Sequence, residues 1–283
     1  MAPLALALVL VAAFGHAGWN ALSKRLPGGA AFVWTQTVFG CLCLLPFAIA
    51  AGVLDDGARM SPAIVLMAMA SGCMHSTYFV FLQRGYAAGD LSLVYPLARG
   101  TGPIFATAGA IAILGERPGP LALAGTAAIA AGVVLLLATR GLARGPALVY
   151  ALLTGLLIGI YTVWDGHAVR ASEAEPVVYL LLTNITVVTL LGPAAFRNRA
   201  TVAFLLRDHR RAVAAVGVLA SMSYALVLFA TRLAGVAYVA PAREVSILIG
   251  AVIGTRYYFE HGGWQRIAGA AAIVAGVIVL ALS

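Results

Sequence analysis

The chain has 283 residues, of which 62% are hydrophobic and only 10% are charged. Soluble domains average about 25% charged residues, so this composition excludes an ordinary water-soluble protein. The formal net charge of +8 comes from basic residues at the ends of apolar runs, where they indicate membrane topology and not nucleic-acid binding.

The apolar runs are each about twenty residues long, which is the length of a helix that crosses a bilayer core. They do not alternate apolar with polar residues, as the strands of a membrane β-barrel would. We therefore predict an all-α integral membrane protein. Its ten spans are expected near residues 3–22, 31–53, 62–83, 91–114, 119–139, 146–165, 175–196, 212–231, 236–256 and 264–282.

Two segments depart from this pattern of spans and short joints. Residues 1–18 resemble a secretory signal peptide but lack its basic start, and the repeat described next needs them, so they are kept as the first span. Residues 196–211, FRNRATVAFLLRDHRR, form a long basic joint that can carry an interfacial turn.

The two halves of the chain repeat one another at an offset of about 144 residues. Residues 115–138 and 259–282 are identical at eleven of twenty-four positions, among them the glycines that pair 125 with 269 and 132 with 276. The same comparison pairs other distinctive residues: Arg99 with Arg243, Pro96 with Pro241, Trp19 with Trp164, Asn20 with Asp165, Arg25 with Arg170, and Tyr78 with Tyr224.

Each half holds five expected spans. Because five is odd, the second half must cross the membrane in the opposite sense to the first. We predict one membrane domain built from two inverted five-helix repeats, residues 1–142 and 143–283. Such repeats are typical of transporters whose binding site lies near the bilayer midplane between the halves.

Residues 89–116, GDLSLVYPLARGTGPIFATAGAIAILGE, and the glycine-rich helix after each glutamate resemble the drug/metabolite transporter superfamily, in its ten-helix EamA branch. The resemblance covers essentially the whole chain, although EVSILIG replaces GTGPIFA in the second half. Four-helix multidrug members carry a membrane-embedded Glu in their first helix, where this chain has Asn20 and, at its counterpart, Asp165. Bacterial amino-acid exporters, the YddG-like exporters among them, are the nearest group. The resemblance implies a central cavity lined by aromatic and polar side chains.

Arg99 stands about nine residues into its expected span, where a charge normally faces a bundle interior or a wet cavity. A guanidinium there suits a carboxylate or phosphate of the cargo, and a structural ion pair with Glu244 is the alternative. Tyr95 shares the helix face of Arg99 with the small residues Gly102 and Ala106, as a cavity wall or a close helix contact would.

Arg243 is the repeat partner of Arg99, whereas Glu244 occurs in the second half alone. On a regular helix adjacent side chains point about 100° apart, so these two are not expected to face one neighbour. If the cargo is a zwitterion, one arginine should bind its carboxylate and Glu244 its ammonium. A structural salt bridge is the alternative for Glu244.

His75 lies mid-span, where an imidazole can bind a carboxylate or carry a proton. Other candidates for the pathway are aromatic or polar residues for which packing or interfacial anchoring is the alternative: Tyr78, Tyr224, Trp164, Trp19 and Asn20. Hinge candidates are the prolines that interrupt helical hydrogen bonding, with simple curvature as the alternative: Pro96, Pro103 and Pro241. Glu116 and Glu260 precede turns and are expected to cap the helix that follows.

The sequence predicts a secondary transporter that exports small polar or amphiphilic metabolites, amino acids first, across the cell inner membrane by alternating access. A carrier of anionic metabolites, nucleotide sugars or drugs is the alternative, and a membrane enzyme is disfavoured because no catalytic motif is present. No Walker A or metal-ligand spacing occurs, so we expect no cofactor and no metal. The expected partners are a small-molecule substrate and the lipid bilayer, and a monomer can suffice.

Basic residues gather in the loops after odd-numbered spans, which predicts that these loops are cytoplasmic and that both termini lie together outside. The odd-side loops hold Lys24, Arg25, Arg84, Arg140, Arg144, Arg197, Arg199, Arg207, Arg210, Arg211, Arg256 and Arg266, and the others hold Arg59, Arg117, Arg170 and Arg232.

Overall fold

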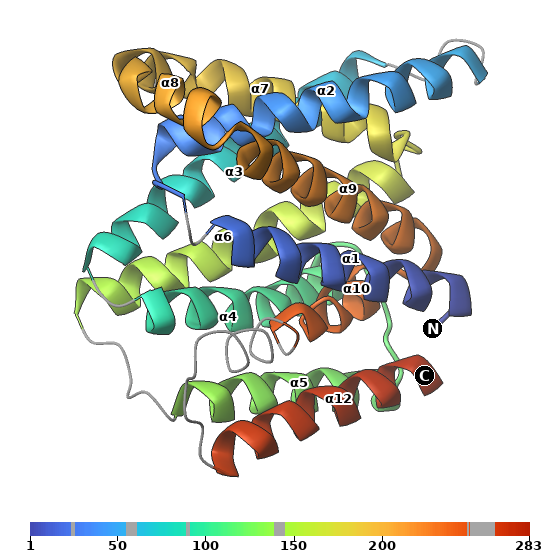
Figure 1. Ribbon diagram of the computed structural model, residues 1–283. Coiled ribbons are helices and arrows are strands. Elements are labelled where there is room, and N and C mark those ends of the chain that lie inside the picture. Colours follow the sequence, from blue (N-terminus) through green and yellow to red (C-terminus); the bar gives the residue numbers. More distant parts are fainter. Residues whose placement is uncertain (24–25, 55–60, 89–90, 139–144, 248, 250–263) are drawn as a thin grey trace.

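The computed structural model describes residues 1–23, 26–54, 61–88, 91–138, 145–247, 249 and 264–283, and the regular secondary structure of these residues is helical (Figure 1). The first half contains α1 Pro3–Ser23, α2 Ala30–Leu54, α3 Pro62–Ala88, α4 Leu91–Ala112 and α5 Pro120–Ala138. The second half contains α6 Pro146–Arg170, α7 Pro176–Arg197, α8 Arg199–Asp208, α9 Arg210–Ala234, α10 Val236–Ala242 and α12 Trp264–Leu282.

Six of the described helices are long and apolar enough to cross a membrane, namely α1, α2, α3, α6, α7 and α9. Shorter apolar stretches occur in α5, over Pro120–Leu135, and in α12, over Ala271–Leu282. The protein is therefore an all-helical membrane protein. The full count of ten spans stays a prediction.

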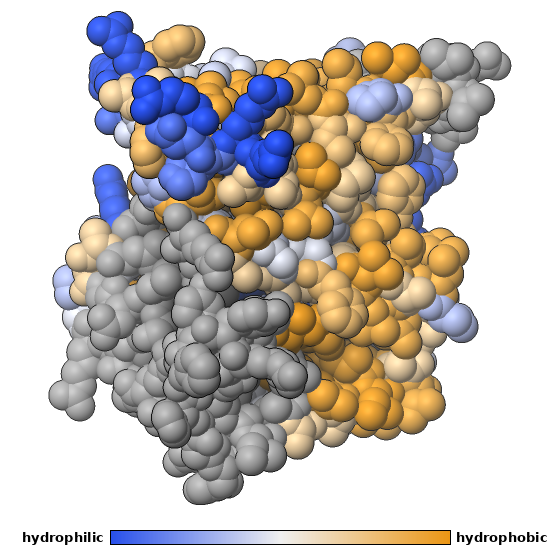
Figure 2. Space-filling model, in the orientation of Figure 1, coloured by the Kyte–Doolittle hydropathy of each residue, from blue (hydrophilic) through white to orange (hydrophobic). Residues whose placement is uncertain are grey.

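Large apolar side chains lie on the outside of the bundle. Leu4, Phe14 and Phe47 are 62%, 65% and 54% exposed, which would be costly in water and suits contact with lipid chains. On the face shown in Figure 2, apolar residues cover much of the surface and hydrophilic residues gather toward its edges. The helix ends lie at those edges (Figure 1).

Two elements differ from the sequence prediction. The basic joint expected to form a turn instead forms α8, whose Leu205 is fully buried against Val213 and Val216 of α9. The ninth expected span is not one continuous helix. Its first part, α10, ends at Ala242, the backbone turns at residues 243–244, and helical backbone resumes at residues 245–247.

The helices pack in pairs that join the two halves of the chain. The pairs in close contact include α1 with α9, α3 with α6, α2 with α7, α4 with α10 and α5 with α12. In the α5–α12 pair, glycines allow the backbones to meet: a Cβ atom at Gly132 would lie 2.6 Å from the Gly269 carbonyl oxygen, and one at Gly125 would lie 2.8 Å from that of Gly276. The Met1 amino group donates to the Ala281 carbonyl at 3.4 Å, so the termini lie together, as predicted.

The face of α4 that carries Arg99 packs tightly on α6. A Cβ atom at Gly102 would lie 2.6 Å from Cγ2 of Ile158, and Ala106 is fully buried. At these two positions the small residues therefore make a close helix contact and do not line a cavity wall.

Candidate functional site

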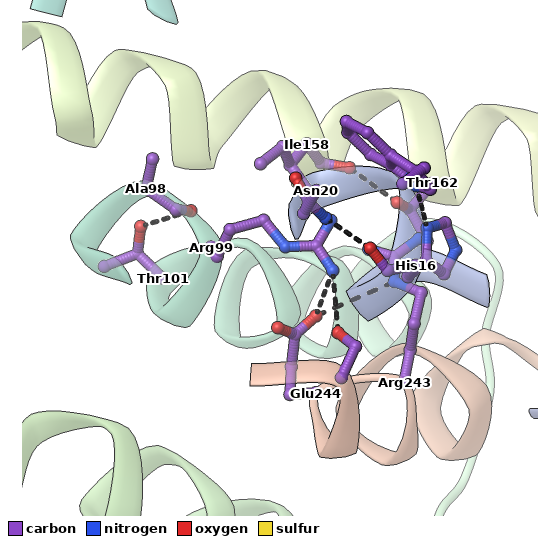
Figure 3. A network of polar contacts seen from close by, with 11 residues as sticks. His16, Asn20, Ala98, Arg99, Thr101, Ile158, Thr162, Arg243 and Glu244 are labelled. Atoms are coloured by element: carbon purple, nitrogen blue, oxygen red, sulfur yellow. Dashed lines mark hydrogen bonds and ion pairs between the residues drawn. The ribbon is translucent and has the colours of Figure 1, made fainter. Parts of the chain in front are cut away.

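Three buried charged side chains meet where α10 ends beside α4 (Figure 3). Glu244 Oε1 lies 3.5 Å from Arg99 Nη2 and 3.7 Å from Arg243 Nε. Arg99 Nη2 also donates to Ser246 Oγ at 3.4 Å. Arg243 and Glu244 are each only 1% exposed. The structure therefore brings together the two repeat-related arginines and the one acid beside them.

The backbone that carries Arg243 and Glu244 departs from a regular α-helix. Pro241 has no N–H, and the Glu244 N–H bonds the Pro241 carbonyl three residues back at 3.0 Å. The Ser246 and Ile247 N–H groups likewise reach back three residues, at 3.1 and 2.9 Å. Glu244 lies beside Arg99, and Arg243 lies beside Glu244, so the expectation that these two adjacent residues do not face one common neighbour stays a prediction.

His16 of α1 belongs to the same polar network (Figure 3). The Trp19 indole donates to His16 Nδ1 at 3.0 Å, which leaves Nε2 as the protonated nitrogen of a neutral ring. Asn20 Nδ2 donates to the His16 backbone carbonyl at 2.6 Å. His16 Nε2 is buried and has no hydrogen-bond partner among the described residues, so one donor remains available in the core.

The charge of this cluster is not balanced. Within the cluster, two guanidinium groups share the Glu244 carboxylate, so the cluster by itself carries one excess positive charge. Among the described residues, Arg243 Nη2 and both Glu244 side-chain oxygens have no hydrogen-bond partner. Unpartnered buried polar atoms cost about 1–3 kcal/mol each, and more when charged. The cluster is therefore chemically suited to bind an anionic group.

A second polar cluster surrounds Asp165 of α6, which is 1% exposed. Tyr179 of α7 donates to Asp165 Oδ1 at 2.7 Å, and Tyr224 of α9 donates to Oδ2 at 2.5 Å. Both lengths lie in the range of charge-assisted O–H···O⁻ bonds. Three helices thus hold one carboxylate through two phenol groups.

Aromatic rings lie beside this carboxylate. The Tyr161 and Tyr224 ring centroids are 6.2 Å apart in an edge-to-face arrangement. His75 of α3 lies 4.0 Å from Tyr161 and 5.6 Å from Tyr224, and Tyr78 lies 6.0 Å from Tyr161, all between ring centroids. Three of the aromatic residues selected from the sequence, His75, Tyr78 and Tyr224, therefore gather around Tyr161.

One face of α6 carries Asp165 together with an aromatic and a hydroxyl side chain. Ile158, Tyr161, Thr162 and Asp165 follow helical spacing and are all buried. Tyr161 and Thr162 therefore lie inside the bundle, on the same face of the helix as the carboxylate.

The remaining selected residues are placed differently. The Trp164 indole donates to the Met67 carbonyl at 2.9 Å, and this side chain is 37% exposed, as an anchoring residue would be. Trp19 and Asn20 bond His16, as described above. Pro241 directly precedes the helix break, whereas Pro103 lies inside the continuous helix α4. The side chains of Tyr95 and Pro96 lie outside the described part of the structure.

Sequence reasoning missed several residues of the two clusters. Asp165 was selected only as the repeat counterpart of Asn20, with no role of its own. His16 and Tyr161 were not selected, because their helical spacing with Trp19 and Trp164 is equally typical of packing. Ser246 and Tyr179 carried no sequence signal of their own.

Glu116 caps a different helix from the one expected. Its Oε1 and Oε2 accept from the N–H groups of Val236 and Ala237 at 3.0 and 2.9 Å, so it caps α10 and not α5, the next helix in the chain. The loop after α4 folds back to the start of α10, which packs on α4 and which sequence proximity does not reveal. The Glu260 part of this expectation lies outside the described residues.

No group of three or more His, Cys, Asp or Glu side chains suited to a metal ion occurs among the described residues.

Residues 3–138 match the EamA-like transporter family. This match covers 136 of the 283 residues, so the first half of the chain is similar to that family.

The fold of this membrane protein also occurs among solved structures. One of them, titled "Crystal structure of protein", superimposes with a TM-score of 0.73 at 16% sequence identity, over 98% of this chain and 96% of that one. At this identity the likeness concerns the fold alone. None of the curated proteins matches the chain in sequence.

Proposed function

We propose that this protein is a member of the EamA-like transporter family and a secondary transporter of the inner membrane that exports small polar or amphiphilic metabolites, with amino acids as the leading class. The observation that carries the proposal is the buried Arg99–Glu244–Arg243 cluster with its excess positive charge. A guanidinium presents planar donors that match a carboxylate, the group common to all amino acids.

The proposed mechanism is alternating access in a ten-span bundle of two inverted repeats, residues 1–142 and 143–283. The helix pairs support this arrangement. The repeat predicts that α1 corresponds to α6, α2 to α7, α3 to α9, α4 to α10 and α5 to α12. Under this correspondence, exchange of the two halves converts the α1–α9 pair into the α6–α3 pair. The same exchange leaves the α2–α7, α4–α10 and α5–α12 pairs unchanged. Rocking of one half against the other would then expose the midplane site to each side in turn.

The interruption after α10 also supports a site at this position. Discontinuous membrane helices commonly form the binding sites of secondary transporters, because unwound backbone leaves polar groups available. Here the interruption holds the Arg243 and Glu244 side chains, both buried, next to Arg99. Pro241 directly precedes it and is the hinge candidate best placed to change the direction of α10.

A carrier for anionic metabolites, such as nucleotide sugars, is the second candidate. The specific observation in its favour is that two arginines share a single carboxylate, which suits a cargo with a net negative charge. The aromatic rings around Tyr161 and the carboxylate of Asp165 favour a cargo that also has a cationic or apolar part. We therefore place amino acids first.

Uptake into proteoliposomes tests the proposal, with labelled amino acids, a nucleotide sugar and a cationic dye offered separately. We expect wild-type protein to carry amino acids. Arg99→Gln should weaken their apparent affinity about ten- to a hundredfold, the effect of losing a charge-assisted hydrogen bond. The matched control is Arg232→Gln, at an exposed position at the end of α9. Transport of the nucleotide sugar or the dye alone would contradict the amino-acid assignment.

A further inference from the structure

Asp165 is the one buried acid of the described bundle interior whose carboxylate has no basic partner. No Lys, Arg or His among the described residues lies within 4 Å of its oxygens, which receive only the hydroxyls of Tyr179 and Tyr224. Glu244, by contrast, lies within 4 Å of both arginines. An ionised carboxylate that is 1% exposed is costly unless a positive charge accompanies it.

The unused hydrogen-bond acceptor positions of the Asp165 carboxylate indicate which kind of ligand it can bind. An ionised carboxylate offers about four acceptor positions, and the two phenol groups use one on each oxygen. A primary ammonium has three donors and can fill the positions that remain. A metal ion would need several further oxygen or nitrogen ligands, and no such group is present among the described residues.

The rings beside Asp165 suit the same partner. Tyr161 stands one helical turn before Asp165 on α6, and Tyr224 both donates to the carboxylate and lies 6.2 Å from Tyr161 between ring centroids. His75 packs against both rings. Aromatic faces attract cations, most strongly where water is excluded. A cation held by Asp165 would therefore also contact aromatic rings.

We infer that Asp165, with Tyr161 and Tyr224, is a subsite for the ammonium group of the cargo, and that the arginine cluster takes the carboxylate. This inference rests on the proposed function and assigns the ammonium to Asp165 in place of Glu244.

Three related ligands separate the two subsites: leucine, 4-methylpentanoate, which lacks the amino group, and 3-methylbutylammonium, which lacks the carboxylate. Binding is measured by thermal shift and by competition on purified protein. Asp165→Asn should weaken leucine and 3-methylbutylammonium about ten- to a hundredfold and change 4-methylpentanoate less than about twofold. Arg99→Gln should weaken leucine and 4-methylpentanoate and spare 3-methylbutylammonium.

Controls keep a folding defect apart from a lost contact. Tyr179→Phe removes one hydrogen bond and keeps the carboxylate, so it should cost much less affinity for 3-methylbutylammonium than Asp165→Asn. Asp208→Asn makes the same chemical change at a surface acid paired with Arg207 and should leave all three ligands unaffected. If Asp165→Asn lowers binding of all three ligands equally, Asp165 is part of the scaffold and the inference is overturned.

Two further outcomes have distinct meanings. If Asp165→Asn abolishes the response of transport to a pH gradient and leaves the ratio of leucine to 4-methylpentanoate affinity unchanged, Asp165 carries a proton and the ammonium subsite is overturned. If wild-type protein transports no amino acid but binds 3-methylbutylammonium through Asp165, the subsite stands and the proposed amino-acid function fails.

Discussion

The Glu116 carboxylate and the Arg170 guanidinium lie 2.6 Å apart, Oε1 to Nη1, and join three segments at the end of the bundle that holds the chain termini (Figure 1). Glu116 lies in the loop after α4, Arg170 ends α6, and the same carboxylate caps the start of α10. The far end of α10 carries Arg243 and Glu244. The contact therefore connects the first half of the chain to the broken helix of the charged cluster.

We predict that Glu116→Ala lowers the free energy of unfolding by about 1–3 kcal/mol, because two N–H groups of α10 and one guanidinium lose their acceptor. Glu116→Gln, whose amide oxygen can still accept, should lose less. Arg170→Gln should cost no more than about 1 kcal/mol, since its side chain is 40% exposed and the ion pair is screened by solvent. Thermal unfolding of purified protein measures all three. Equal effects of Glu116→Ala and Arg170→Gln would show that the ion pair and not the cap matters.

The α5–α12 contact should not tolerate an added methyl group. A Cβ atom at Gly132 would lie 2.6 Å from the Gly269 carbonyl oxygen, a backbone atom that cannot move aside easily. We expect Gly132→Ala to destabilise the protein by about 1–3 kcal/mol despite the better helix propensity of alanine. Gly18→Ala in α1 is the matched control, because its new methyl would meet only Leu219 Cδ1 at 3.7 Å. A stabilised Gly132→Ala variant would refute the close contact.

A double-mutant cycle separates the two roles considered for Glu244. If Glu244 mainly balances the arginines, Glu244→Gln should cost about 3–5 kcal/mol, because it leaves two buried guanidinium groups uncompensated. Arg243→Gln should cost less, because the Arg99–Glu244 pair remains. The double variant should then cost clearly less than the sum of the single ones. Thermal stability and amino-acid uptake are measured on the same preparations. Unchanged stability with selectively reduced amino-acid uptake in Glu244→Gln would instead favour the ammonium role predicted from the sequence.

The membrane orientation can be tested by cysteine labelling with a membrane-impermeant reagent, in a variant that lacks the three native cysteines. Cysteines at positions 1 and 283 should react from the outside, because the opposite end of the bundle carries the basic residues around α8. A cysteine at Ala200, an exposed position on α8, should react from the cytoplasmic side only. Reaction of the two termini from different sides would contradict both the hydrogen bond from Met1 to Ala281 and the ten-span prediction.

The sequence by itself determined the class of protein and much of its plan. Apolar runs of bilayer length indicated a membrane protein, and the repeat of 115–138 in 259–282 marked two helices, α5 and α12, that pack on each other through the repeated glycines. The contact between Arg99 and Glu244 could also be predicted from the sequence, as the structural ion pair that was the alternative to a cargo-binding role for Arg99. These features follow from local patterns and from the cost of leaving charges unpaired in a membrane.

Only the tertiary structure decided which polar groups meet. Asp165 lies near the end of a span by position, yet Tyr179 and Tyr224 from two other helices bury it and bond both its oxygens. Glu116 had the chemistry of a helix cap, but packing placed α10 and not α5 within its reach. Arg243 and Glu244 stand in a turn after Ala242, and packing of α10 beside α4 brings Glu244 within 3.5 Å of Arg99. In each case the deciding partner lies on a distant segment or in irregular backbone, and local sequence patterns carry no information about such long-range packing.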